Sequence, residues 1–316
     1  MNVDQILRCP RCKGDLRREG SSLHCVSVAC GLKSAEVAGI PVLLNPDRSL
    51  FDPNHFTPHA KTTFVAAGSM SERIGRWLPC PSRDLAGDHF YSVLAAELRR
   101  HPRDRRRVLV VGCGNGSARY GELREVDDIV FVETDVSLAG PAQIVCDASD
   151  LPFANASFDL VVCQAVLEHV LEPQRCVDEI HRVLADDGIA YATVPFMQHV
   201  HMGAYDFTRF THSGLRWLFR KFEEVDSGLA NGPGSMLAWS VEYFWLASAE
   251  GTISRRIVKA VNRLLFAWIN VFDLPLARRR GAYDAAGGFY FLGRRAATEL
   301  PARAMLEYYR GADSAK

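Results

Sequence analysis

A glycine-rich loop followed by two acidic residues could bind a nucleotide. The run VLVVGCGNG places Gly112, Gly114 and Gly116 directly after an apolar stretch. Such a loop lets the backbone turn tightly and approach a ligand where a helix begins, although it can also be an ordinary turn. Asp135 follows about twenty residues later, where a carboxylate can accept hydrogen bonds from both hydroxyls of a ribose. Asp147 closes the next apolar run. Together these residues predict a nucleotide-type site.

The loop differs from the one that binds dinucleotides. Enzymes that use NAD usually have a third glycine at the position occupied here by Ser117. Their fingerprint also does not require a second carboxylate such as Asp147. The sequence therefore favours a nucleotide-like cofactor other than NAD.

Four of the nine cysteines are concentrated near the N-terminus and form a candidate metal site. Cys9 and Cys12 lie in CPRC, and Cys25 and Cys30 follow after a gap. Four thiolates suit a tetrahedral zinc ion with a closed, structural coordination sphere. A module of about forty residues also has too small a hydrophobic core to fold without such a bound metal ion. The alternatives are that His24 replaces one cysteine, or that the module holds no metal.

A segment rich in histidine and aromatic residues is the candidate acceptor site. It reads VPFMQHVHMGAYDFTRFTHSGLRWLF. His201 could act as a general base, because the pKa of an unperturbed histidine lies near neutrality. Asp206 could orient that imidazole or bind the substrate, and Arg209 could pair with an acidic group. The structural alternative is an Asp206–Arg209 ion pair that caps a helix near Thr211.

These candidates fall near the ends of short apolar runs that alternate with helix-like stretches. The runs are RVLVVG, DIVFVE, QIVC, FDLVVCQ, GIAYATV, FEEVDSG and GGFYFLGRR. Strands that are buried on both faces lose the alternation of apolar and polar residues. The pattern therefore predicts an α/β fold, with a parallel sheet covered by helices on both faces. Residues 90–100 and 173–184 have the apolar spacing of such helices.

Four motifs in this order resemble the class I S-adenosylmethionine-dependent methyltransferases of the type 11-like branch. They are VLVVGCGNG, ETDVS, CDASDLPFANASFDLVVCQAVLEHV and EIHRVLADDGIAYATVP. The resemblance spans Val108 to Val225 and the last strand. It implies a Rossmann-like sheet of seven strands and S-adenosylmethionine as the cofactor. It also implies methyl transfer to an oxygen or nitrogen nucleophile, which we expect on a small molecule or a lipid-linked or glycan metabolite.

The resemblance also assigns residues to the cofactor. In that family the glycine loop faces the methionine end, and the carboxylates after the second and third strands approach the ribose and the adenine. The cofactor-binding residues implied here are Gly112, Cys113, Gly114, Gly116, Asp135, Asp147, Ala148 and Gln164. The segment with His201, Asp206 and Arg209 resembles one that lines the acceptor pocket. Glu168 and His169 fall in the family's LEH motif, and we expect them to shape the following turn.

The N-terminal run resembles a zinc ribbon. CPRCKGDL, LHCVSVACG and VAGIPVLL are similar to small zinc-ribbon proteins that activate tRNA and protein methyltransferases, and to the zinc module of certain ribosomal RNA guanine methyltransferases. Two rival functions follow. One is an RNA methyltransferase whose ribbon binds the RNA. The other is a non-catalytic binding module that keeps the fold as a scaffold.

Composition and charge narrow the possible partners. Lys plus Arg equals Asp plus Glu at 37 each. The chain therefore lacks the excess of positive charge that would favour binding to a long nucleic acid. The sequence begins without the pattern of a signal peptide and has no apolar stretch long enough to cross a membrane, so we expect a cytoplasmic protein. The sequence specifies neither the acceptor nor the oligomeric state.

The predicted organisation has four parts and one insertion. Residues 1–45 form the zinc-ribbon-like module, 46–87 a linker, 88–300 the methyltransferase domain and 301–316 a C-terminal tail. A helical insertion is expected at about 230–285. Its best helix, Ile257–Phe272, carries an apolar stripe beside basic residues. Such a stripe usually packs on its own protein, and the alternative is weak contact with a membrane surface.

Overall fold

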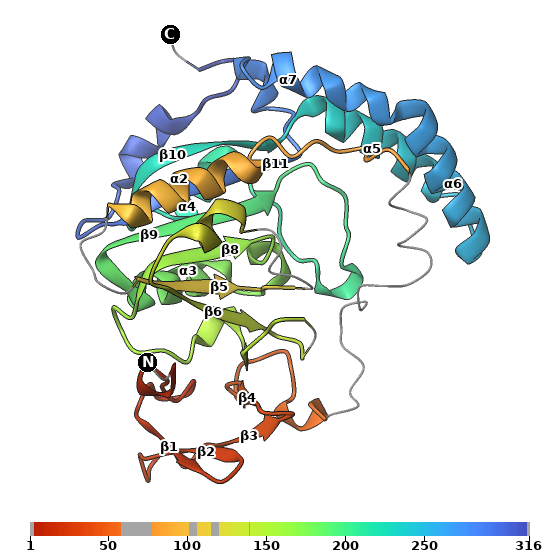
Figure 1. The fold of residues 1–316 in the computed structure, drawn as a ribbon. Coiled ribbons are helices and arrows are strands. Elements are labelled where there is room, and N and C mark those ends of the chain that lie inside the picture. Colours follow the sequence, from red (N-terminus) through yellow and green to blue (C-terminus); the bar gives the residue numbers. More distant parts are fainter. Residues whose placement is uncertain (1–2, 58–77, 101–105, 115–119, 139, 315–316) are drawn as a thin grey trace.

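One mixed sheet organises the protein (Figure 1). The computed structural model describes residues 3–57, 78–100, 106–114, 120–138 and 140–314. Within them the sheet has 11 strands in the order β1-β2-β3-β4-β7-β6-β5-β8-β9-β11-β10. The strands are β1 (Leu16–Glu19), β2 (Ser22–Cys25), β3 (Lys33–Val37), β4 (Ile40–Leu43), β5 (Arg106–Val111), β6 (Ile129–Asp135), β7 (Ile144–Cys146), β8 (Phe158–Gln164), β9 (Leu184–Pro195), β10 (Phe222–Asn231) and β11 (Gly288–Arg295).

Helices cover this sheet and connect its strands. The α-helices of the described residues are α2 (Gly87–Arg99), α3 (Pro173–Val183), α4 (His212–Leu218), α5 (Pro233–Leu246), α6 (Gly251–Phe266) and α7 (Asp273–Leu276). Short 3₁₀ helices include η1 (Val3–Gln5), η2 (Pro53–His55), η4 (Gly121–Glu125), η5 (Ala148–Asp150), η6 (Leu167–His169), η7 (Gly203–Tyr205), η8 (Ala267–Phe272), η9 (Arg280–Ala282) and η10 (Ala302–Tyr308).

The seven strands predicted from the apolar runs form one continuous part of the sheet. Their order is β7-β6-β5-β8-β9-β11-β10. Neighbours from β7 to β9 are parallel, whereas β11 is antiparallel to both β9 and β10. The predicted α/β class is therefore confirmed.

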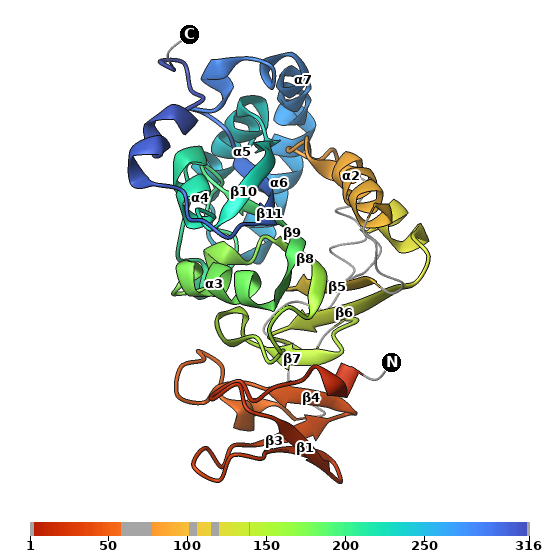
Figure 2. The same cartoon turned by 90° about the vertical axis from the view of Figure 1, so that its left-hand side faces the viewer.

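The predicted number of strands is wrong, because the N-terminal module extends the sheet. Its strand β4 pairs in parallel with β7, with Val42 opposite Val145 and Leu43 opposite Cys146. Figure 2 shows β4 beside β7 and the remaining ribbon strands beyond it. The run IPVL is too short to indicate from the sequence alone which strand it joins. The result is a sheet of 11 strands in place of seven.

The module also shares the core of the sheet. Ile6 and Leu7 belong to the same buried apolar cluster as Phe153. The backbone N–H of Arg8 donates to the carbonyl oxygen of Pro152 at 2.9 Å, and that of Ala154 donates to Ile6 at 2.8 Å. The N-terminal module is therefore attached to the larger fold at two places, through these backbone hydrogen bonds and through the β4–β7 pair.

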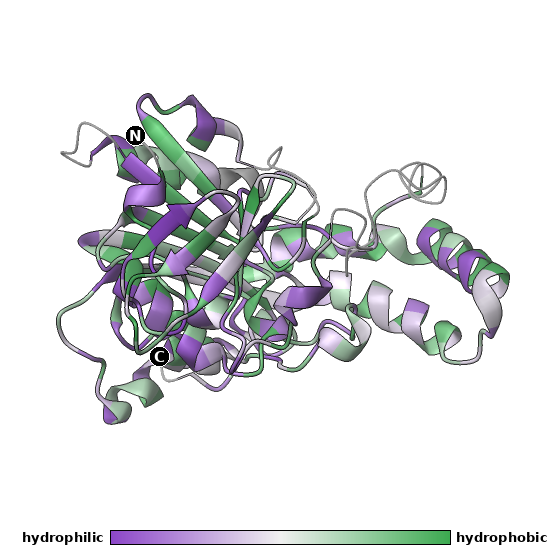
Figure 3. Ribbon diagram, turned by 90° about the horizontal axis from the view of Figure 1, so that it is seen from below, coloured by the Kyte–Doolittle hydropathy of each residue, from purple (hydrophilic) through white to green (hydrophobic). Residues whose placement is uncertain are grey.

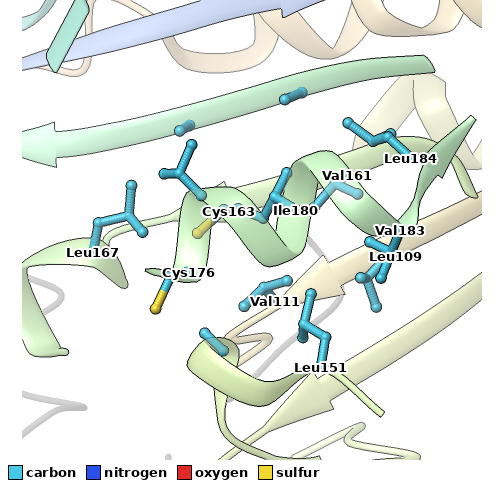
Figure 4. Packing of buried hydrophobic residues seen from close by; sticks show 14 of the residues in the cluster. Leu109, Val111, Leu151, Val161, Cys163, Leu167, Cys176, Ile180, Val183 and Leu184 are labelled. Atoms are coloured by element: carbon cyan, nitrogen blue, oxygen red, sulfur yellow. The ribbon is translucent and has the colours of Figure 1, made fainter. Parts of the chain in front are cut away.

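Alternate side chains of the central strands point to opposite faces of the sheet, as the two-residue repeat of a strand requires. In β5, Leu109 and Val111 face the cluster that contains α3. Val108 and Val110 face the cluster that contains α2. Figure 4 shows α3 lying over β5 and β8 with its apolar residues inward. These residues recur at helical spacing and are Cys176, Val177, Ile180 and Val183.

A helical arm follows β10 and precedes β11. It contains α5, α6, η8 and α7, and it projects from the body of the protein (Figures 1 and 3). The predicted helix at Ile257–Phe272 begins earlier, at Gly251, and changes to 3₁₀ geometry after Phe266. Ile257, Leu264 and Trp268 of its apolar stripe are exposed. The stripe therefore does not pack on the rest of the protein, as such stripes usually do. Within the described ranges, none of the helices combines the length and hydrophobicity that a bilayer crossing requires.

Candidate functional site

A cavity of about 840 Å³ opens at the carboxyl ends of the parallel strands. This is the usual ligand position in an open α/β sheet, and the volume suits a nucleotide-sized molecule. Seven of the eight residues predicted to bind the cofactor line it: Gly112, Cys113, Gly114, Asp135, Asp147, Ala148 and Gln164. Gly116, the eighth, lies outside the described residues. Their role as cofactor ligands stays a prediction.

The glycine loop depends on backbone freedom at two positions. Gly112 has φ +70° and Gly114 has φ +56°, in the left-handed region that other residues rarely adopt. A Cβ on Gly112 would also lie 2.4 Å from Cγ2 of Val166. The loop therefore follows β5 closely because glycine stands at these positions.

Asp135 is the last residue of β6, and only one of its two carboxylate oxygens has a hydrogen-bond partner among the described residues. Its Oδ2 accepts a 2.9 Å hydrogen bond from the N–H of Gly114. Oδ1 is buried and has no hydrogen-bond partner among the described residues. Burial raises the pKa of this carboxyl group, against the lowering effect of backbone N–H groups. A buried acceptor without a donor is costly, so this oxygen is suited to a ligand hydroxyl.

Asp147 and Gln164 are engaged by other side chains. Asp147 accepts hydrogen bonds from Ser149 N at 3.0 Å and from the hydroxyl of Ser49 at 2.9 Å. The Oε1 of Gln164 accepts a 2.5 Å hydrogen bond from the hydroxyl of Tyr91. Both residues are thus fixed at the cavity wall by protein contacts.

Part of the cavity wall comes from a segment that the sequence predicted only as a linker. Arg48, Leu50 and Phe51 line the cavity, and the ring of Phe51 stacks on Tyr205 with centroids 5.8 Å apart. Nothing in the sequence indicated this role, because the segment has no regular apolar period.

The predicted acceptor residues separate into two groups. His201 lines the cavity, whereas Asp206 and Arg209 are not among its lining residues. The side chain of Asp206 is fully buried and forms a two-pronged ion pair with Arg209, one contact measuring 2.7 Å. This pair, together with the N–H of His201, holds the pKa of Asp206 well below its usual range. Thr211 caps α4 through its own hydroxyl, which accepts from Gly214 N, so the ion pair is not the cap.

Glu168 and His169 lie beside His201. The Nε2 atoms of the two histidines are 3.1 Å apart. Glu168 is only 1% exposed, and burial raises its pKa to about 8. His169 and His201 both line the cavity. The sequence placed Glu168 and His169 in a turn and gave no indication of their contact with His201, which is more than thirty residues away.

The four N-terminal cysteines converge. Their Sγ atoms all lie within 4.8 Å of one another, with Cys9–Cys30 at 3.6 Å and Cys12–Cys25 at 3.4 Å. Four sulfurs about 2.3 Å from one zinc ion require spacings of this size. A Cβ on Gly14 would lie 3.3 Å from the sulfur of Cys12, so glycine leaves room at the cluster.

His24, the alternative ligand, is engaged elsewhere. Its Nε2 is 2.8 Å from the hydroxyl of Ser22, and its Nδ1 is 3.3 Å from a carboxylate oxygen of Glu19. The donor set therefore fits a tetrahedral metal through the four thiolates.

Parts of this chain are similar to known proteins. Residues 109–192 match a family model described as a methyltransferase domain. The chain is 37% identical over 86 residues to a "Putative methyltransferase" of Encephalitozoon cuniculi, which covers 26% of this chain and 41% of that protein. It is 32% identical over 94 residues to an uncharacterized protein of Methanocaldococcus jannaschii, covering 28% of this chain and 36% of that protein. The chain thus spans about two fifths of the length of these curated relatives.

The chain also matches a solved structure, the Burkholderia thailandensis 1,6-didemethyltoxoflavin-N1-methyltransferase with bound 1,6-didemethyltoxoflavin and S-adenosylhomocysteine. It has 17% sequence identity and a TM-score of 0.40, and the match covers 67% of this chain and 79% of that chain. The segment that matches the methyltransferase family model, residues 109–192, carries Gly112, Gly114, Asp135 and Asp147.

Proposed function

We propose that this protein is an S-adenosylmethionine-dependent methyltransferase. The observation that carries the proposal is Asp135, which lines the cavity beside the glycine loop with a buried, unpaired Oδ1. The two hydroxyls of a ribose supply the donors that this carboxylate lacks. The methyltransferase domain at residues 109–192 supports the same assignment.

The acceptor binds at the end of the cavity formed by His169, His201, Met202 and Tyr205. An oxygen or nitrogen nucleophile placed there attacks the methyl carbon in line with the departing sulfur. Positioning and exclusion of water supply most of the rate acceleration in such a reaction. We propose a small molecule or a lipid-linked or glycan metabolite as the acceptor.

A structural zinc ion at Cys9, Cys12, Cys25 and Cys30 completes the proposal. The convergence of four sulfurs supports it. The ion would hold the ribbon segment together, and the ribbon in turn carries β4 to its place beside β7.

Labelled methyl transfer tests the function. The purified protein is incubated with S-adenosylmethionine that carries a labelled methyl group and with fractionated cell extract. We expect label in the small-molecule or lipid fraction, and much less label with the Asp135→Ala variant when S-adenosylmethionine is subsaturating. Label confined to RNA would instead support the RNA methyltransferase, and absence of label from every fraction would support a binding module.

A further inference from the structure

Three side chains that the sequence assigned to other tasks converge at the acceptor end of the cavity. Glu168 and His169 lie in η6, and His201 lies in the loop after β9. One ligand atom from each comes within 4.8 Å of the other two. The arrangement of their hydrogen bonds decides what can occupy the space between them.

Both histidines present an Nε2 lone pair to this space. Nδ1 of His169 is 2.7 Å from the carbonyl oxygen of Tyr205, which can only accept, so Nδ1 carries the proton. Nδ1 of His201 faces the ionised carboxylate of Asp206 at 3.4 Å, which favours a proton on that nitrogen as well. In their neutral forms, both rings therefore direct an unprotonated Nε2 toward the other across 3.1 Å.

Glu168 adds a third electron-pair donor once it is deprotonated, as binding to a metal ion requires. Its Oε1 lies 3.7 Å from Nε2 of His169 and 3.9 Å from Nε2 of His201, too far for a hydrogen bond. Its Oε2 is buried without a partner in the described structure. A proton shared by the two histidines would leave Glu168 unsatisfied, whereas a cation in the centre satisfies all three groups.

The distances match a metal ion. A triangle with sides of 3.1, 3.7 and 3.9 Å has one point equidistant from its corners, about 2.1 Å from each, which is the length of zinc bonds to histidine nitrogen and carboxylate oxygen. Two histidines and one carboxylate are a recurrent ligand set for divalent transition metals with open coordination positions. We propose that Glu168, His169 and His201 bind a divalent transition-metal ion that faces the acceptor.

The surrounding groups support this assignment. Metal-bound histidines usually donate their second nitrogen to a carbonyl or a carboxylate, which fixes the ring. Tyr205 O and Asp206 supply one such acceptor each. Arg209 holds Asp206 in place through their ion pair. Asp206 and Arg209 are therefore positioning residues, which explains why neither lines the cavity.

The chemical consequence rests on the proposed methyltransferase function. An acceptor hydroxyl that coordinates the ion loses its proton to water more easily, because the metal stabilises the oxyanion. The oxyanion then forms a bond to the methyl carbon while the carbon–sulfur bond breaks. The electron pair of that bond goes to sulfur and leaves a neutral thioether. The substrate class favoured by open metal positions is an alcohol or phenol with a second oxygen nearby.

Metal counting with Co²⁺ tests the site without any need for activity. Metal-free protein is dialysed against excess Co²⁺, freed of unbound ion and analysed by mass spectrometry. We expect two ions per chain for the wild type, one for His201→Gln and one for the Cys9→Ser, Cys12→Ser variant. His199→Gln is the matched control, because His199 lies on the same loop but stacks on Tyr243, and it should keep two ions.

Two results would overturn the site. One is a His201→Gln variant that keeps the wild-type count, and the other is a wild type that holds only the ribbon ion. A Glu168→Gln variant provides a second check and should bind Co²⁺ at least tenfold more weakly at this site. Separate calorimetry with S-adenosylhomocysteine distinguishes failure of the metal site from failure of the methyltransferase assignment.

The helical arm carries a second, independent observation. In α5 to α7, 13 large apolar side chains are exposed, among them Phe244 at 71% and Trp268 at 60%. They form what we call the apolar arm face: Leu237, Phe244, Trp245, Ile253, Ile257, Val261, Leu264, Leu265, Trp268, Val271, Phe272, Leu274 and Leu276. Figure 3 shows these helices away from the body of the protein. An apolar surface of this extent on a folded protein generally marks an interaction site.

The positive charge of the helical arm indicates what kind of partner it binds. Exposed cations flank the apolar arm face, namely Arg255, Arg256, Lys259, Arg278, Arg279 and Arg280. Between residues 233 and 280 the only exposed acidic residue is Glu250, since Glu242 and Asp273 are buried. Aromatic and aliphatic side chains beside clustered cations suit the interface of an anionic bilayer. We infer that the arm docks on an anionic lipid surface.

Vesicle sedimentation tests this docking. Vesicles of phosphatidylglycerol and phosphatidylcholine should pellet the wild type, and vesicles of phosphatidylcholine alone should pellet much less. An Ile257→Ser, Leu264→Ser variant should lose binding at least fivefold, whereas Leu306→Ser, an exposed leucine in η10, should bind like the wild type. Absence of binding to anionic vesicles would overturn the inference. So would a stable dimer in analytical ultracentrifugation that the double variant abolishes, because the arm would then contact a second copy.

Discussion

The N–H of Gly114 donates a 2.9 Å hydrogen bond to Oδ2 of Asp135 and thereby ties the loop after β5 to the end of β6. The other carboxylate oxygen is buried without a partner in the described part of the chain. One oxygen thus fixes the side chain, and the second is left for a ligand. A cofactor site at this position depends on the different environments of the two carboxylate oxygens of Asp135.

Gly112→Ala should lower the free energy of unfolding by about 1–3 kcal/mol, because it combines a strained φ with a clash against Val166. Gly114→Ala is the control. It shares the left-handed conformation, but a Cβ there meets nothing within 4 Å, so its loss should be smaller. Urea unfolding measures both. Adding Val166→Ala should restore part of the loss in Gly112→Ala and none in Gly114→Ala, and equal losses in the two single variants would contradict the clash.

Cys9→Ser combined with Cys12→Ser should release one zinc ion per chain, because two of the four ligands are lost. Native mass spectrometry counts the ion. Cys80→Ser, at an exposed cysteine outside the cluster, should keep it. We also expect earlier proteolysis of residues 1–45 in the double variant. A wild type purified without chelators that contains no zinc would instead favour a metal-free ribbon.

His212 should make the protein less stable in mild acid. The pKa of this histidine is lowered to about 4, chiefly by burial, with Arg310 and Arg216 opposing its protonation further. The unfolded chain binds a proton near pH 6.5 and the folded chain does not, so stability is complete above pH 6.5 and falls toward pH 4.

The expected loss between pH 7 and pH 5 is about 2 kcal/mol from this group. His212→Gln should reduce the pH dependence of urea unfolding by that amount, although it lowers stability at pH 7 through the lost contact with Ser227. His55→Gln, at a highly exposed histidine, is the control for the substitution itself. The same slope in wild type and His212→Gln would rule out this histidine as the cause.

The sequence predicted the parts of the fold that depend on local patterns. Strands such as β5 and β8 are buried on both faces and appear as continuous apolar runs, and α3 repeats its apolar residues at helical spacing. The pairing of β4 with β7 joins segments about a hundred residues apart, and the four residues of β4 contain no signal for that partner.

The residues of the candidate site also differ in whether the sequence could predict them. The glycine loop and Asp135 were identified because their spacing along the chain reflects one strand–loop–strand unit. The convergence of Glu168 with His201 depends on the path of the loop after β9, and the contact of Ser49 with Asp147 depends on where the ribbon attaches. Such contacts are set by tertiary packing and have no periodic pattern in the sequence.

Calorimetric titration with S-adenosylmethionine tests the central claim most directly. We predict that the wild type binds it and that Asp135→Ala, shown to be folded by circular dichroism, binds at least tenfold more weakly, because a charge-assisted hydrogen bond contributes about 1.5–3 kcal/mol. Asp127→Ala, at an exposed carboxylate before β6, should bind like the wild type. A wild type that does not bind, or a dissociation constant unchanged in folded Asp135→Ala, would contradict the assignment.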